Sequence, residues 1–226
     1  MVEKKVIAVI VEGPSDESAI GGILKEYFCS EEVQFAVVHG DITSDYRTTV
    51  VNVVEKVNKL INELSIKYGY KNKDFVGIIH IADTDGTFAD DFIVEREGTD
   101  FQYYENRIEN SDAEAVKKRN KHKSEIMLKL YTTGKINGIR YRLYFNSCNL
   151  EHVLYNELKP FSDDEKEIMS DEFAEKYEGK AAEFIKYISK PDIAVKGTYK
   201  ETWKFIQKDN NSLCRNSNMH LIFNNK

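Results

Sequence analysis

The chain contains little proline and little cysteine, and these shortages exclude several classes of protein. Only 3 of its 226 residues are proline, which favours a chain rich in helix. The three cysteines, Cys29, Cys148 and Cys214, are scattered, and no two have the spacing of metal ligands. An odd number of scattered cysteines also argues against a disulfide framework, so we expect a reducing, cytoplasmic setting.

Long apolar runs are absent as well. The apolar run near the start covers only residues 6–11. Such a run is too short for a membrane span or for the core of a signal peptide, so we expect no association with a membrane.

The overall composition favours a globular protein. Hydrophobic residues make up 41% of the chain and charged residues 31%, a balance that permits a buried core. The length suits one domain with elaborations. The net charge is −6, so any binding of nucleic acid requires a local basic patch.

Strands and helices alternate in the first part of the sequence. Apolar runs predict strands at 6–11, 33–39 and from Phe75 to the acidic turn that ends at Gly86. Helical stripes lie between them, one capped by Ser15 and one from about 45 to 68. This alternation predicts an α/β fold with a parallel sheet and helices on both faces.

The rest of the chain adds to this sheet. Residues 88–139 interrupt the pattern and are interpreted as a mostly helical insertion, with a fourth strand following at 140–145. The α/β domain would span 1–158, and 159–226 would form a helical C-terminal extension packed on it. Residues 219–223 could be a short last strand or a docking tail.

Acidic side chains follow these strands. Asp83 and Asp85 are two residues apart, so on a strand they would point the same way. Glu12 ends the first strand, and parallel strands bring their carboxyl ends to one edge. Asp16 falls in the first turn of the next helix, and Glu151 starts the helix after the fourth strand. We therefore expect a carboxylate cluster at this edge.

Clustered hard oxygen ligands favour Mg²⁺ or Mn²⁺ and suit phosphoryl transfer. Simpler interpretations remain open for each residue. Asp83 and Asp85 could form an ordinary acidic turn, and Glu12 and Asp16 could stabilise a helix N-terminus. Glu151, like its neighbour His152, could be a surface residue at a helix start.

The acidic motifs also resemble a known family. Val-Ile-Val-Glu12-Gly13-Pro-Ser-Asp16-Glu, then His39-Gly40-Asp41, then Ile-Ala-Asp83-Thr-Asp85-Gly resemble the Toprim domain of topoisomerases, primases and small nucleases. The Glu-Gly-x-x-Asp form is similar to overcoming-lysogenisation-defect (OLD) nucleases. The segment from Phe145 to His152 resembles one in RloB-like proteins, which are linked to phage defence.

This resemblance covers roughly residues 5–158 and implies a Toprim-like, Rossmannoid parallel sheet. It implies Asp83 and Asp85 as Mg²⁺ ligands, Asp16 as a further ligand, and Glu12 as a ligand or general acid/base. Glu151 would complete the catalytic site. OLD-type sites also use a lysine near the scissile phosphate, and three candidates stay open: Lys180, Lys196 and Lys200.

Our leading hypothesis is a Mg²⁺- or Mn²⁺-dependent Toprim nuclease acting in phage defence or DNA repair, with DNA favoured over RNA. Phosphate contacts would come from a basic run that could otherwise be only a solvated helix face. Its members are Lys117, Lys118, Arg119, Lys121 and Lys123.

The alternative is a catalytically silent or partner-activated Toprim module that acts as a metal- or nucleotide-binding regulatory protein. The acidic net charge favours this alternative. The sequence has no P-loop of the form Gly-x-x-x-x-Gly-Lys-Ser/Thr, so an associated ATPase would be a separate chain. A homodimer is the expected assembly by resemblance.

Overall fold

A five-stranded sheet forms the centre of the protein, a computed structural model in which residues 5–37 and 42–224 are described. The strand order is β2-β1-β3-β8-β7, and every pairing is parallel except that of β7 with β8. The strands are β1 (Val6–Val11), β2 (Glu32–Val37), β3 (Phe75–Asp83), β7 (Lys135–Ile136) and β8 (Ile139–Asn146). The predicted α/β fold with a mostly parallel sheet is confirmed.

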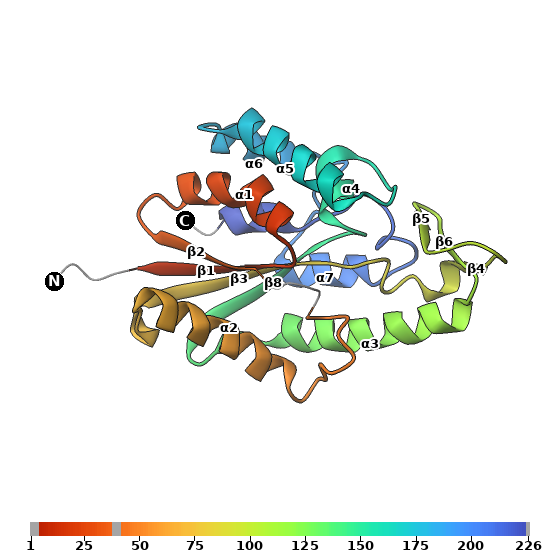
Figure 1. Cartoon of the computed structure of the whole chain (residues 1–226), viewed down its shortest axis with the longest axis horizontal. Helices are drawn as coiled ribbons and strands as arrows, with labels where there is room; N and C mark the ends of the chain where they lie inside the picture. The colour runs from red at the N-terminus through yellow and green to blue at the C-terminus, as the bar shows by residue number, and fades with distance from the viewer. Residues whose placement is uncertain (1–4, 38–41, 225–226) are drawn as a thin grey trace.

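Helices cover both faces of this sheet (Figure 1). One face packs against α1 (Pro14–Tyr27), α4 (Leu150–Tyr155), α5 (Asp163–Tyr177), α6 (Ala181–Ile188) and the 3₁₀ helix η3 (Met219–Asn224). The other face packs against α2 (Val53–Tyr68), α3 (Ala113–Thr132) and α7 (Tyr199–Ile206). All six residues of β1 are therefore buried, which explains its unbroken apolar run.

Two helices begin at different residues from those predicted. The cap of α1 is Gly13 rather than Ser15, because Pro14 fits the first helical position and the Gly13 N–H donates to the Asp16 carboxylate. The second helix begins at Val53 rather than near 45. Asp45 instead accepts hydrogen bonds from the backbone and side chain of Arg47, which favours a turn.

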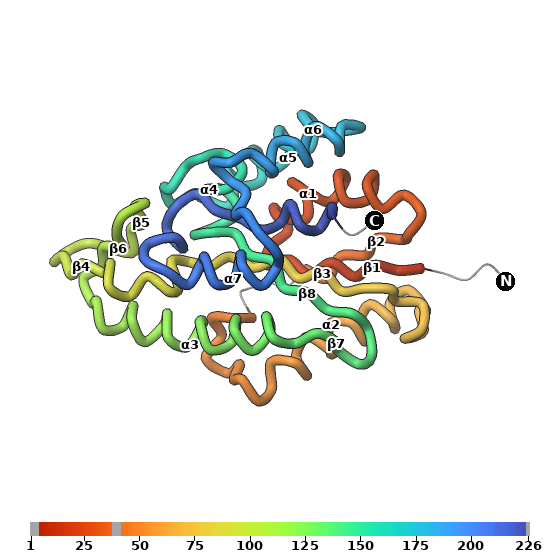
Figure 2. The backbone as a smooth tube through the Cα atoms, turned by 180° about the vertical axis from the view of Figure 1, so that it is seen from behind, coloured from red at the N-terminus to blue at the C-terminus, as the bar shows by residue number. Residues whose placement is uncertain are grey.

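The insertion is less helical than predicted. Its first half contains a three-stranded sheet of order β4-β6-β5, formed by β4 (Ile93–Glu95), β5 (Gln102–Tyr104) and β6 (Arg107–Asn110). Isoleucine, valine and tyrosine in these segments favour strands. The helix α3 then runs from this small sheet back to β8, as Figure 2 shows from behind.

The C-terminal part of the chain is helical, as predicted, through α5, α6 and α7. Residues 219–224 form the 3₁₀ helix η3 and not a strand. The predicted end of the second strand, with the motif His39-Gly40-Asp41, lies outside the described residues. Within the described ranges, no helix is long and apolar enough to cross a membrane.

Candidate active site

Glu12 and Asp83 meet where β1 and β3 end. One carboxylate oxygen of Glu12 accepts the backbone N–H of Asp83 at 3.1 Å. The Asn146 amide, at the end of β8, donates to the Asp83 carboxylate at 3.2 Å. The parallel pairing of β1, β3 and β8 produces this meeting, because their carboxyl ends lie side by side at one edge.

Asp83 lies at the electrostatic centre of this edge. Burial raises the pKa of its carboxyl group well above the usual value. The charges of Glu12, Asp16, Glu151 and Asp85 raise it further, in that order. The charges of the other four predicted acidic residues therefore each act on Asp83.

Asp16 approaches the cluster from the first turn of α1. Its carboxylate accepts the Gly13 N–H at 3.0 Å, which fixes the side chain back toward the end of β1. Burial raises the pKa of Asp16 to about 6, although the Gly13 hydrogen bond opposes this, and the charge of Glu151 adds to the rise. Asp16 is thus a helix-terminal acid and a member of the cluster at the same time.

Asp85 points differently from the sequence-based expectation. The strand ends at Asp83, and Asp85 follows it in a turn with φ 48°. The rule that side chains two residues apart on a strand point the same way therefore does not apply to Asp83 and Asp85. Gly86 follows with φ 71°, and a Cβ there would lie 2.7 Å from Ile108. This turn aims the Asp85 carboxylate at the ammonium group of Lys123, 2.6 Å away.

Three residues of α3, which we call the α3 flank, hold this turn: Arg119, Asn120 and Lys123. The Arg119 guanidinium donates to the Asp85 carbonyl oxygen at 2.5 Å, and the Asn120 amide donates to the Gly86 carbonyl oxygen at 3.4 Å. Lys123 is fully buried, so the prediction that it contacts phosphate on the surface is wrong. The insertion thus forms one wall of the site.

Glu151 and Lys166 form the opposite wall, which we call the α4–α5 flank, and His152 follows Glu151 in α4. The Lys166 ammonium lies 3.2 Å from Glu151. Burial lowers the pKa of Lys166, but the charges of Glu151, Asp83 and Asp16 outweigh burial and raise it. Glu151 and His152 are both buried, so the interpretation of either as a surface residue is wrong.

The lysine candidates named from the sequence lie elsewhere. Lys180, Lys196 and Lys200 are exposed, and the Lys180 ammonium donates to the Lys176 carbonyl oxygen. Lys166 is instead the lysine whose charge acts on three of the acids. Sequence reasoning missed it because α5 is distant along the chain and reaches the site by packing on α1 and α4.

The segment that precedes η3 supports the loops of the site from behind. The Ser212 carbonyl oxygen accepts the backbone N–H of Cys148 at 3.1 Å and the hydroxyl of Thr84 at 3.2 Å. The Asn216 carbonyl oxygen accepts the Ser147 N–H at 2.7 Å. A run of Asn and Ser between 210 and 218 was the available signal, since these residues favour backbone hydrogen bonding in turns.

The donor chemistry of this edge suits a hard divalent cation such as Mg²⁺ or Mn²⁺, because the donors are carboxylate oxygens. Their arrangement is not a closed ligand sphere. Among the described residues, no group of three His, Cys, Asp or Glu side chains is positioned to hold a metal ion. Instead, the Lys123 ammonium lies against the Asp85 carboxylate, and the Lys166 ammonium lies against the Glu151 carboxylate.

Comparison of the chain with protein-family models, curated proteins and solved structures finds no match. The site must therefore be interpreted from its own geometry.

Proposed function

We propose that the protein is a Toprim-type nuclease that hydrolyses phosphodiester bonds of nucleic acid with Mg²⁺ or Mn²⁺. The observation that carries this proposal is the convergence of Glu12, Asp16, Asp85 and Glu151 on the half-buried Asp83. Five carboxylates that share one edge repel one another, and divalent cations are the counter-ions that relieve such repulsion.

Glu12 and Asp83 would be the central ligands, with Asp16 and Asp85 completing the set. When bound, the metal ion would polarise the phosphate and lower the pKa of a water molecule. Glu12 would accept the proton of the attacking water, because it ends β1 beside Asp83 and is half-buried. Glu151 would orient Lys166, which lies 3.2 Å away.

Lys166 fits the role of the phosphate-binding cation. Its side chain is 37% exposed, so it can reach a bound substrate while its charge still acts on Asp16 and Asp83. Lys123 has a different role, because it is fully buried against Asp85. It would position the Asp85 carboxylate and would not contact substrate.

The substrate would approach along α3. Lys117, Lys118 and Lys121 are exposed on this helix, whose residue Asn120 contacts the turn after Asp85. Exposed lysines next to the carboxylate edge provide the local positive charge that a protein of net charge −6 requires. DNA remains the favoured substrate.

The direct test is cleavage of plasmid DNA, single-stranded DNA and tRNA with Mg²⁺, Mn²⁺ or chelator. Asp83→Asn and Glu12→Gln should each reduce cleavage at least about 100-fold, because each removes a charged oxygen ligand. Asp100→Asn is the matched control, since Asp100 is exposed in the insertion. Unchanged cleavage in Asp83→Asn would refute the assignment.

A regulatory Toprim module is the second candidate. The pairing of Asp85 and Glu151 with lysines favours it, because the ion pairs relieve part of the repulsion without metal. This candidate predicts that Mn²⁺ raises the melting temperature of the wild type, that Asp83→Asn abolishes this rise, and that no substrate is cleaved. Metal-dependent cleavage lost in Asp83→Asn would exclude it.

A further inference from the structure

A second cavity lies at the opposite end of the sheet from the carboxylates. It has a volume of about 500 Å³, in the size range of small-molecule sites. Its lining comes from β1, from the amino-terminal half of β3, from β8, from the segment that follows α1, and from η3. Ile78 in the cavity and Asp83 in the site are five residues apart on β3, so their Cα atoms are separated by about 17 Å.

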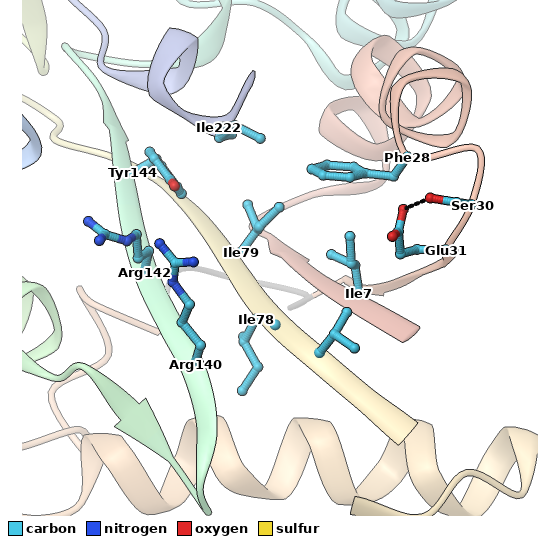
Figure 3. A pocket seen from close by; sticks show the side chains of 12 residues that line it. Ile7, Phe28, Ser30, Glu31, Ile78, Ile79, Arg140, Arg142, Tyr144 and Ile222 are labelled. Atoms are coloured by element: carbon cyan, nitrogen blue, oxygen red, sulfur yellow. Dashed lines mark hydrogen bonds between the residues drawn. The ribbon is translucent and has the colours of Figure 1, made fainter. Parts of the chain in front are cut away.

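The floor of this cavity is apolar because successive side chains along each strand point to opposite faces of the sheet, and isoleucines occupy the face toward the cavity. Ile7 and Ile79 lie on the face of the sheet that packs against α1, and Figure 3 shows both between the walls of the cavity. Gly77 shares this face with Ile79, two residues along β3. A Cβ built on Gly77 meets only the Arg140 carbonyl oxygen, at 4.0 Å, so the missing side chain leaves the floor open.

The two walls differ in charge. Arg140 and Arg142 extend from β8 on one side, and Phe28 and Glu31 lie on the other (Figure 3). The two arginines are two residues apart on one strand, so they share a face and their Cα atoms are about 7 Å apart. The Arg142 guanidinium lies 4.6 Å from the centre of the Tyr199 ring, which fixes its direction.

We propose that this cavity binds a small amphipathic anion, with its apolar body on the isoleucine floor and its acidic group between Arg140 and Arg142. Two arginines in a protein of net charge −6 make an anionic group the complementary one. The apolar floor requires an apolar body in addition, so inorganic phosphate alone would bind poorly. The proposal is independent of the nuclease activity.

The first test uses two dyes of similar shape, anionic 1-anilinonaphthalene-8-sulfonate and neutral N-phenyl-1-naphthylamine, with fluorescence titration of the full chain. Gly77→Leu fills the floor and should weaken binding of both dyes at least about tenfold. Gly134→Leu is the matched control. Gly134 does not line this cavity, and a Cβ built on it meets nothing within 4 Å. Unchanged dye binding in a folded Gly77→Leu variant would overturn the proposal.

The second test isolates the charge. The double variant Arg140→Gln/Arg142→Gln should weaken binding of the anionic dye about tenfold and binding of the neutral dye less than twofold. Decanoate and decyl phosphate should displace the anionic dye from the wild type, and whichever competes better identifies the acidic group. Equal displacement by decanol, or an equal effect of the double variant on both dyes, would overturn the assignment of an anion. The melting temperature of each variant verifies that it is folded.

Discussion

The two flanks of the carboxylate edge each contribute a lysine, but the two lysines differ in burial and in their distance from a carboxylate. Lys123 of the α3 flank is fully buried and 2.6 Å from Asp85. Lys166 of the α4–α5 flank is 37% exposed and 3.2 Å from Glu151. A buried cation held at short range against a carboxylate supports the structure, whereas a partly exposed cation shared among several acids can exchange them for a phosphate. The comparison therefore separates the support of the site from its chemistry.

The largest expected effect is on stability at the α3 flank. Lys123→Met should lower the free energy of unfolding by about 3 kcal/mol, because Asp85 then loses its buried partner. Lys166→Met should lower it by only about 1 kcal/mol, since solvent screens its pair. Chemical denaturation without added metal measures both values. Equal losses in the two variants would contradict the distinction between the flanks.

Activity should show the reverse order among variants that remain folded. Under the proposed function, Lys166→Met should lower kcat/KM for cleavage about 100-fold, and Lys166→Arg should recover part of the loss. Lys159→Met is the matched control, because Lys159 is exposed and pairs with Glu157 and Glu165. Steady-state cleavage assays measure the change. A loss below threefold in Lys166→Met would remove this lysine from the mechanism.

The α4–α5 flank should also be the one that weakens in mild acid. Burial, and then the charge of Arg215, lower the pKa of His152 from 6.5 to about 4. The unfolded chain binds this proton first as the pH falls below 6.5, so stability is lost between pH 6.5 and 4. This site should contribute about 2 kcal/mol of the loss between pH 7 and 4.5.

The measurement is the free energy of unfolding at the two pH values, in the wild type and in His152→Gln. Gln cannot be protonated in this range, so the variant should lose about 2 kcal/mol less than the wild type. The same pH dependence in both proteins would show that His152 does not titrate as its burial requires.

The smallest effects are expected at the exposed lysines of α3. Replacing Lys117, Lys118 and Lys121 together with Gln should change the free energy of unfolding by less than about 0.5 kcal/mol. Binding of double-stranded DNA is measured by fluorescence anisotropy with Ca²⁺ in place of Mg²⁺. The slope of the logarithm of the binding constant against the logarithm of salt concentration should be smaller in magnitude by about 2–3 in this variant. Lys129→Gln, near the end of the same helix, serves as the control. An unchanged slope would place the substrate elsewhere.

The sequence alone was sufficient for the parts of the fold that follow from pattern. Continuous apolar runs identified β1 and β3, and parallel topology placed Glu12 beside Asp83. The direction of Asp85 could not be predicted, because it depends on the positive φ that the turn imposes. The small sheet of the insertion was missed since its strands have only three or four residues.

The lysines of the site escaped sequence reasoning for a different reason. Lys123 looked like one member of a solvated basic run, and only the packing of α3 on the turn after β3 distinguishes it from Lys121. Lys166 lies in an acidic helix of unremarkable pattern, and its role depends on contact between α5 and α1. Both are long-range consequences of tertiary packing, which local periodicity does not encode.

The hydrogen bonds from the segment before η3 have a consequence for synthesis of the protein. Thr84 and Cys148 both donate to the carbonyl oxygen of Ser212, so the loops that carry the acids are completed by residues made much later. A nascent chain that has not yet exposed Ser212 from the ribosome lacks this support. The support of the carboxylate edge would therefore be completed only after Ser212 has left the ribosome, and not when the strands that carry the acids have been made.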